Sequence, residues 1–310
     1  MITTVDPGRI ECIVPGADQL GETPLWCDRH RKLWWLDIER PRLQSFDPAS
    51  GAHEVHECDA RFLGCLALGD EDSHLIALDL GLYRRPLSGN EVTLVARVEE
   101  GVDNRLNDGR VDARGRFWVG TMDNALQRPS GSLYRVDPDG TVERMLDGII
   151  VSNGVAFSPD SRTLYFTDTR QHRSWRFDLD IDDGRIFNQR LFADYSLTGD
   201  RPDGACVDVD GGIWTAFFAG SRIVRYRPDG EIDVVVPVPL TNPTCVCFGG
   251  ADLKTLYITS ATKFLTPEQR ASEPLAGSVL AVHGLAQGMP EHRFGFSRAS
   301  QSGSSKEQVK

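Results

Sequence analysis

Residues 105–122 read RLNDGRVDARGRFWVGTM, and residues 152–169 read SNGVAFSPDSRTLYFTDT. Both segments begin with a polar Asn-containing group, continue through a short apolar run and a polar turn, and end in a second run rich in aromatic and β-branched residues. A third segment, RPDGACVDVDGGIWTAFF at 201–218, follows the same order. The pattern predicts two strands joined by a turn in each segment.

This order recurs six times along the chain. The segments that lead into the six units contain Glu22, Gly64, Asp108, Asn153, Asp203 and Thr244, which lie 41 to 50 residues apart. Each unit then continues with a third strand and a weaker fourth strand. A period of this length with about four strands is typical of a β-propeller, in which every blade buries its faces against neighbouring blades and the ring must close.

We therefore expect an all-β, six-bladed β-propeller with four-stranded blades, closed by an N-terminal strand near residues 9–14 that completes the last blade. Two stacked β-sandwiches would explain the strands but not the repeat. The propeller should occupy residues 1–296 as a single domain. Residues 263–276 should form a loop with one helical turn inside the last blade. The Ser-rich segment 297–310 has no large apolar residue and is expected to be a disordered tail.

Composition excludes several classes of function. The 310-residue chain carries a net charge of −11 and has no basic cluster, so we expect no nucleic-acid partner and no anionic membrane surface as a partner. No apolar run approaches the ~18 residues of a membrane helix, and the N-terminus lacks the features of a signal peptide. Seven cysteines without regular pairing distances favour a reducing, cytoplasmic location in which most are buried. No obligate protein partner is evident.

The repeat also predicts a site. In a propeller the innermost strand of each blade lines the central channel, so residues that hold the same position in different repeats converge at one mouth of that channel. At this position the chain places carboxylate and amide side chains from four repeats, namely Glu22, Asn107, Asp108, Asn153 and Asp203. An oxygen-rich set of this kind suits one divalent cation, Ca²⁺, Mg²⁺ or Mn²⁺, with Zn²⁺ or Fe²⁺ also compatible. Water and substrate would complete the coordination shell.

Asn-Gly and Asp-Gly are also common turn dipeptides, and each of these residues taken alone is more easily explained as part of a turn. Asp139-Gly140, Asp183-Gly184 and Asp229-Gly230 are plain turns of this type, but they fall between outer strands. Asp178, Asp180 and Asp182 imitate the start of an EF-hand. We reject a calcium loop there because the sixth position is not glycine and the twelfth is not glutamate.

The segments quoted above, together with GETPLW (21–26), GSLYRVDPDG (131–140) and CFGGADLKTLYITSA (247–261), resemble the SMP-30/gluconolactonase/regucalcin family of six-bladed propellers. The resemblance covers roughly residues 18–295. It implies that Glu22, Asn153 and Asp203 are metal ligands, and that Arg105 and Asn107 face the substrate. Some relatives place an acidic residue shortly after the GTM motif to hold a substrate hydroxyl. Here that contact is shifted to Asp123 or Asn124, or is lost.

The resemblance implies a metal-dependent hydrolase that opens small sugar-acid lactones, such as glucono-, xylono- or arabinono-lactone, with Asp203 as general base. Two other functions stay open on the sequence. An oxygen cage can hold Ca²⁺ in a regulatory protein that has no lactonase turnover. A propeller can also serve as a protein-binding platform, because a fold alone specifies no function.

Overall fold

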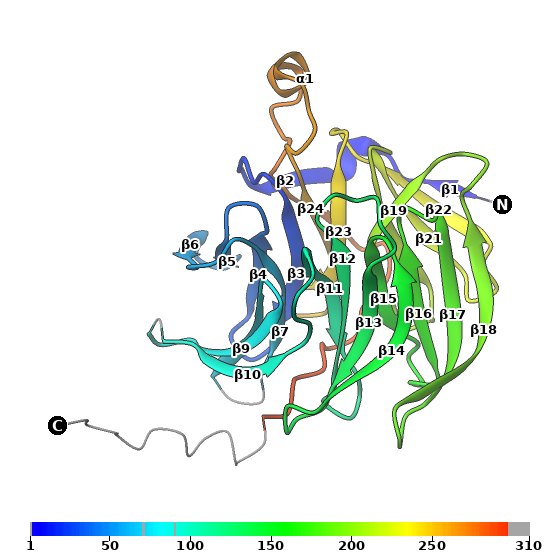
Figure 1. Ribbon diagram of the computed structural model, residues 1–310. Helices are drawn as coiled ribbons and strands as arrows, with labels where there is room; N and C mark the ends of the chain where they lie inside the picture. The colour runs from blue at the N-terminus through cyan, green and yellow to red at the C-terminus, as the bar shows by residue number, and fades with distance from the viewer. Residues whose placement is uncertain (1, 70–71, 90, 297–310) are drawn as a thin grey trace.

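Six antiparallel sheets make up the protein, as the computed structural model of residues 2–69, 72–89 and 91–296 shows (Figure 1). In every sheet the strands pair in the order in which they follow along the chain, with two exceptions: the N-terminal segment adds one strand in parallel to the fifth sheet and one strand to the sixth. The innermost strands are β3 (Gly21–Cys27), β7 (Leu63–Leu68), β11 (Asn104–Val111), β15 (Ser152–Phe157), β19 (Arg201–Val207) and β23 (Pro243–Gly249). Each innermost strand contacts the next around the ring, and β23 contacts β3, so the ring is closed.

The remaining strands follow outward in each blade. The second strands are β4 (Lys32–Asp37), β8 (Ser73–Leu78), β12 (Phe117–Asp123), β16 (Thr163–Asp168), β20 (Ile213–Phe218) and β24 (Thr255–Ser260). The third are β5 (Arg42–Asp47), β9 (Gly81–Pro86), β13 (Gly131–Val136), β17 (Arg173–Asp180), β21 (Arg222–Tyr226) and β25 (Val279–His283). The outermost are β6 (Ala52–Glu57), β10 (Thr93–Arg97), β14 (Val142–Ile149), β18 (Arg185–Asp194), β22 (Ile232–Pro237) and β2 (Ile10–Val14).

The closure occurs where the sequence predicts it. Strand β2 pairs antiparallel with β25, with Ile10 opposite Val282 and Val14 opposite Val279, and so supplies the outermost strand of the last blade. A second tie was not predicted from the sequence: β1 (Thr3–Thr4) pairs in parallel with β22 of the fifth blade. A single 3-10 turn, η1 (Pro7–Arg9), connects the two strands. The N-terminal segment therefore bridges the fifth and sixth blades.

Two further predictions concern the C-terminal part of the chain. The excursion inside the last blade contains one short helix, α1 (Pro267–Ser272), which projects from one face of the ring (Figure 1). The predicted disordered tail at 297–310 lies outside the described residues. Among the residues that are described, no helix combines the length and apolar character needed to cross a membrane.

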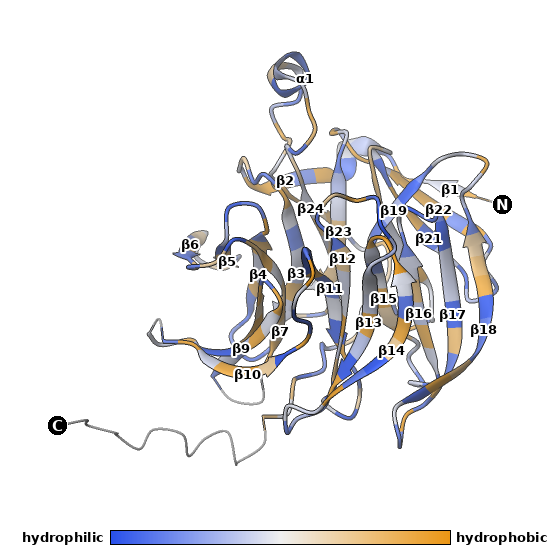
Figure 2. Ribbon diagram, in the orientation of Figure 1, coloured by the Kyte–Doolittle hydropathy of each residue, from blue (hydrophilic) through white to orange (hydrophobic). Residues whose placement is uncertain are grey.

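The core lies between the blades rather than in one central layer. One cluster joins Trp214 and Ile223 of the fifth blade to Val246, Phe248 and other residues of the sixth. Another joins the second and third blades. Apolar residues accordingly recur along all the blades (Figure 2). Five of the seven cysteines are buried among these residues, and all seven are free thiols.

Buried aspartates fix the turns between inner and second strands. Asp208 accepts hydrogen bonds from the Gly212 amide (2.8 Å), the Trp214 indole (2.8 Å) and the Arg225 guanidinium (2.7 Å). Asp112 has an equivalent set of donors in the third blade, including the Trp118 indole at 2.9 Å. Because its donors come from three strands or turns, each aspartate holds the register of its blade.

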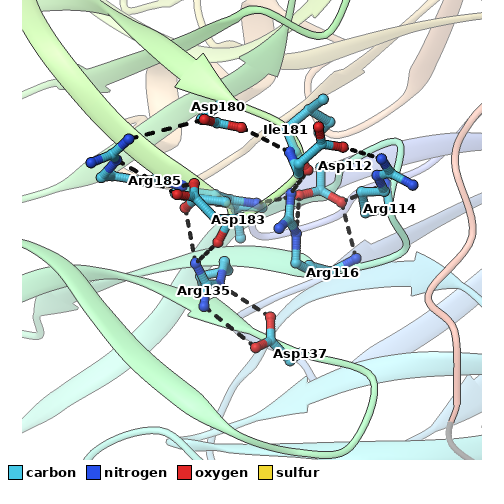
Figure 3. Close-up of polar contacts among 12 residues, drawn as sticks. Asp112, Arg114, Arg116, Arg135, Asp137, Asp180, Ile181, Asp183 and Arg185 are labelled. Carbon is cyan, nitrogen blue, oxygen red and sulfur yellow. Dashed lines mark hydrogen bonds and ion pairs between the residues drawn. The ribbon is translucent and has the colours of Figure 1, made fainter.

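Arginine side chains also connect the third and fourth blades (Figure 3). Arg116 donates to the Ile181 carbonyl (2.8 Å), and Arg135 donates to the carbonyls of Asp183 (2.8 Å) and Gly184 (3.0 Å). These carbonyls belong to the turn between β17 and β18, which is the segment that imitates an EF-hand. The third blade thus holds this turn through its backbone oxygens.

Replacing Asp208 by alanine should lower the free energy of unfolding by about 2–4 kcal/mol, because the substitution leaves the buried Trp214 indole and Gly212 amide without their acceptor and removes one of the two carboxylates that Arg225 binds. Thermal or urea unfolding would measure the effect. The control is Asp229→Ala, in an exposed turn, which should change stability little. Equal losses for the two variants would contradict the role assigned to Asp208.

Candidate active site

All six inner strands share an interruption at the same repeat position. The register between the first and second strand of every blade shifts at this point, between Glu22 and Leu25, Leu63 and Leu66, Leu106 and Gly109, Asn153 and Ala156, Pro202 and Ala205, and Pro243 and Val246. A bulge of this kind bends the strand and re-aims side chains. The predicted site residues lie at these bulges, so their side chains can turn toward the channel axis.

The bulge of the first blade requires an unusual backbone conformation. Thr23 has φ of +48°, which is an uncommon value for a β-branched residue. Its amide donates a hydrogen bond to the carboxylate of the preceding residue, Glu22, at 2.9 Å. In the fourth blade the same region is occupied by Gly154, with φ of +58°. The strained backbone at Thr23 therefore helps to aim the Glu22 side chain.

A pocket of about 590 Å³ opens at this mouth of the channel. Five of the residues singled out from the sequence line it together: Glu22, Arg105, Asn107, Asn153 and Asp203. Its other lining residues are Leu20, Ile38, Met122, Leu126, Val151, Thr169, Arg170, Arg201, Phe218, Lys263 and Phe264. The pocket thus combines converging polar groups with an apolar wall, which is typical of a small-molecule site.

The two carboxylates in the pocket accept few hydrogen bonds from the protein. Glu22 and Asp203 are each 7% exposed, and no donor from the described residues forms a hydrogen bond to the Asp203 carboxylate. Burial raises the pKa of Asp203 well above its usual range, and repulsion from Glu22 and Asp108 adds to this. Burial also raises the pKa of Glu22 to about 8, again with repulsion from Asp108. Buried acids in this state fit a cation between them.

The amide side chains form an ordered chain of hydrogen bonds next to the carboxylates. Arg105 donates to Asn107 Oδ1 at 2.5 Å, and Asn107 Nδ2 donates to Asn153 Oδ1 at 2.8 Å. Asn153 Nδ2 in turn donates to the Thr169 hydroxyl at 2.8 Å, and that hydroxyl donates to the Pro202 carbonyl at 2.6 Å. The chain crosses from the third blade to the fifth and fixes the orientation of Asn153.

The donor set is suited to a hard divalent cation. No group of three or more His, Cys, Asp or Glu side chains able to hold a metal occurs within the described part of the chain, so a third protein oxygen must come from an amide. Asn153 lines the same pocket as the two carboxylates and could supply that oxygen. Two carboxylates and one amide oxygen, with positions left for water or substrate, match the ligand preference of Ca²⁺, Mg²⁺ or Mn²⁺.

The channel is filled below the site. Arg110, on the same inner strand as Asn107, forms an ion pair with Glu291 at 2.7 Å. Its guanidinium also donates to the carbonyls of Val155 (3.2 Å) and Ala205 (3.1 Å) on the next two inner strands. The segment that carries Glu291 follows the last blade. A small molecule therefore has access to the site from the mouth that carries the pocket.

A family model described as the SMP-30/gluconolactonase/LRE-like region matches residues 20–262. The chain belongs to this family. Its relatives include a 6-deoxy-6-sulfogluconolactonase of Pseudomonas putida, which is 38% identical over 92% of this chain and 98% of the relative. An L-arabinolactonase of Azospirillum brasilense is 35% identical over 93% of this chain and 96% of the relative.

The solved structure of a calcium-binding protein, regucalcin, from Agrobacterium tumefaciens superposes on this protein with a TM-score of 0.89. The two are 30% identical, and the match covers 95% of this chain and 99% of the other. The family thus contains sugar lactonases and calcium-binding proteins. The six-bladed fold and the family predicted from the sequence are both confirmed.

Asp123 and Asn124, which the sequence left as possible substrate contacts, do not line the pocket. The Asp123 side chain is fully buried and accepts hydrogen bonds from the amides of Gln127 (3.0 Å) and Arg128 (2.8 Å). The Arg128 guanidinium also binds it at 2.7 Å and holds its pKa below the usual range. Asn124 donates to Asp103 at 2.8 Å. Within the short segment 123–130 that directly follows the GTM motif, Leu126 is the residue that lines the pocket.

The repeat pattern itself indicates a structural role for Asp123. An aspartate follows each of the residues that lead into the first four units, Glu22, Gly64, Asp108 and Asn153, at a spacing of 15 residues. These aspartates are Asp37, Asp79, Asp123 and Asp168. Asp37 accepts hydrogen bonds from the amides of Gln19 and Leu20, and Asp168 from those of Ile150 and Val151. The recurrence marks a structural position at the end of the second strand.

Five lining residues that sequence reasoning missed are cationic or aromatic: Arg170, Arg201, Phe218, Lys263 and Phe264. Arg170 and Arg201 lie close to repeat positions, since Arg170 follows Asp168 by two residues and Arg201 precedes Asp203 by two. Lys263 and Phe264 belong to the excursion inside the last blade, which has no counterpart in the other units. The repeat therefore carries no signal for these two.

Divalent-cation binding should tighten as the pH rises. The raised pKa values of Glu22 and Asp203 mean that the metal-free pocket holds protons near neutral pH, and a cation must displace them. Affinity should increase by up to about tenfold per pH unit for each proton displaced. Calorimetry of Ca²⁺ or Mn²⁺ binding in buffers of different ionisation enthalpy would count these protons. An affinity that does not change between pH 6 and pH 9 would contradict the electrostatics described above.

Asp123→Asn should lower the free energy of unfolding by about 1–3 kcal/mol, because the turn amides and Arg128 lose their charged acceptor. It should leave the KM for a hydrolysed lactone within about twofold of the original value. Asp79→Asn is the matched control in the second blade and should also affect stability alone. A large rise in KM without loss of stability would return Asp123 to the substrate-binding residues.

Proposed function

We propose that this protein is a metal-dependent hydrolase that opens aldonolactones, such as glucono-, xylono- or arabinono-lactone, to the free sugar acids. The observation that carries the proposal is the convergence of Glu22, Asn153 and Asp203 in one pocket, with no donor from the described residues on the Asp203 carboxylate. The similarity to two sugar lactonases supports the choice of substrate class. The substrate is a free small molecule, and the reaction requires no partner protein.

In this proposal Glu22, Asn153 and Asp203 hold one divalent ion, which is Ca²⁺, Zn²⁺, Mn²⁺, Mg²⁺ or Fe²⁺. When bound, the ion supplies Lewis acidity to the lactone carbonyl and neutralises the two buried carboxylates. Lowering of the Asp203 pKa by the ion leaves this residue ionised at neutral pH. Asn107 orients Asn153 through its hydrogen bond of 2.8 Å and presents its amide to the substrate.

The chemical step uses groups already fixed in the pocket. Asp203 accepts a proton from the attacking water as general base. Arg105 is buried and lies close to Glu22 and Asp203, so its positive charge is held where the developing oxyanion or the sugar hydroxyls will lie. The apolar side chains of Met122, Leu126 and Phe218 cover the lactone ring and reduce access of bulk water.

A calcium-binding regulatory role is the second candidate. The same oxygen donors can hold Ca²⁺ without chemistry, and the similarity to a calcium-binding regucalcin favours this alternative. The two functions differ in a measurable way, because only the lactonase turns over a lactone.

Chelator-treated protein should regain hydrolysis of one or two members of a panel of 1,4- and 1,5-aldonolactones when a single divalent metal is added back. Spontaneous opening of each lactone is subtracted. Asp203→Ala should lower kcat at least about 10²-fold, because it removes both the proposed base and a ligand. Asp229→Ala, in an exposed turn, is the control and should keep full activity.

Folded protein that binds Ca²⁺ tightly and hydrolyses no lactone with any metal would contradict the enzyme proposal and support the regulatory role. Substantial activity in Asp203→Ala would remove this residue from the mechanism.

A further inference from the structure

The pocket carries more positive charge than a neutral lactone requires. Its lining includes the cations Arg105, Arg170, Arg201 and Lys263 and the carboxylates of Glu22 and Asp203, and Glu39 outside the lining pairs with Lys263. The two carboxylates are the proposed metal ligands, so a bound divalent ion would cancel their charge. This excess of cations occurs in a chain whose net charge is −11. The positive charge at the mouth is therefore a local property of the site.

Arg170 and Arg201 are held side by side at the boundary of the fourth and fifth blades. The amide of Arg170 donates to Asp168 at 3.0 Å, which fixes its turn. The Thr169 hydroxyl then donates to the Pro202 carbonyl at 2.6 Å. Because Thr169 precedes Arg170 and Pro202 follows Arg201, this bond brings the backbones at the two arginines to neighbouring positions beside the pocket that both residues line.

Neither guanidinium has an acidic partner among the described residues. Two neighbouring arginines of these blades do have one: Arg173 pairs with Asp194 at 3.3 Å and Arg222 pairs with Asp200 at 2.8 Å. Arg170 and Arg201 are only partly exposed. Lys263 also lines the pocket and forms an ion pair with Glu39. Two partly buried arginines that line a pocket and have no carboxylate partner are suited to an oxyanion, which their guanidinium groups can bind in a forked geometry.

The position of the pair indicates which part of the substrate it meets. Arg201 begins β19, and Asp203 lies two residues further along, inside the register shift between Pro202 and Ala205, so their Cα atoms are at most about 7 Å apart. This distance is comparable to the span from the carbonyl of a six-carbon lactone to its terminal substituent. A lactone whose carbonyl lies near Asp203 and Arg105 would therefore direct its far end toward the rim.

We infer that Arg170 and Arg201, with Lys263 nearby, form a subsite for an oxyanion at the terminal carbon of the lactone, so that the preferred substrate is an anionic rather than a neutral aldonolactone. This inference rests on the proposed lactonase function and specifies its substrate class. A terminal sulfonate, phosphate or carboxylate would each supply the required oxygens.

The test uses a matched series of substrates that differ only at the terminal carbon. Glucono-1,5-lactone is compared with its C6 phosphate and C6 sulfonate analogues, and a glucaric acid lactone supplies the carboxylate. The measured quantity is kcat/KM for each anionic lactone divided by kcat/KM for the neutral lactone. The metal-loaded protein should show a ratio of about ten or more for at least one anion. Arg170→Gln and Arg201→Gln should each lower that ratio about tenfold, the usual size of a charge-assisted hydrogen bond.

Arg162→Gln is the control, because Arg162 lies in an exposed turn of the fourth blade outside the pocket; it should keep the original ratio. The anion with the highest ratio identifies the terminal group. A ratio near one, or unchanged ratios in both arginine variants, would overturn the subsite while leaving the lactonase proposal intact.

Absence of turnover for every lactone would overturn the proposed function, and a binding measurement then tests the subsite separately. Calorimetry would compare gluconate 6-phosphate with gluconate. The subsite predicts tighter binding of the phosphate, reduced about tenfold in Arg201→Gln. Equal affinity for the two compounds would overturn it.

Discussion

The structure depends on one constraint: closure of the ring brings side chains from blades that are distant in sequence into the same small, poorly solvated volume. Glu22 and Asp203 come from the first and fifth blades, and both are buried at the channel mouth. Burial raises the pKa values of both groups, and repulsion from Asp108 adds to both shifts. The ring stays closed despite this unfavourable electrostatic energy, because β2 and the interblade cores hold it together without a contribution from the site. The divalent ion proposed for the site would remove this cost by neutralising the two carboxylates.

The bulges in the inner strands allow side chains from several blades to converge on the channel axis. A regular inner strand would alternate its side chains between the two faces of its blade. The shared register shift instead lets a residue at the bulge of each blade turn toward the axis. The type of residue at this position differs from blade to blade. Leu63 and Gly64 of the second blade and Thr244 of the sixth carry no charge there. The site is consequently asymmetric within a nearly symmetric ring.

Much of the fold follows from the sequence because a propeller repeats its local pattern. The period and the strand order follow from a pattern that recurs from unit to unit. Closure by residues 10–14 follows because this strand precedes the first unit and has no blade of its own. The convergence of Glu22, Asn107, Asn153 and Asp203 follows from the same repeat position. The expectation for Asp123 depended on a family pattern rather than on the repeat, and the spacing of 15 residues shows why that residue is engaged in a turn. Lys263 and Phe264 could not be predicted, because they lie in an insertion that packs over the mouth in three dimensions and repeats nowhere.

Anomalous scattering from crystals grown with Mn²⁺ or Zn²⁺ tests the central claim most directly. The account predicts one strong peak at the channel mouth, within about 2.0–2.6 Å of an oxygen from each of Glu22, Asn153 and Asp203. It also predicts that this peak disappears in Asp203→Ala. A peak located instead at the acidic turn of residues 178–183, or a mouth that stays free of metal under conditions that restore activity, would contradict the account.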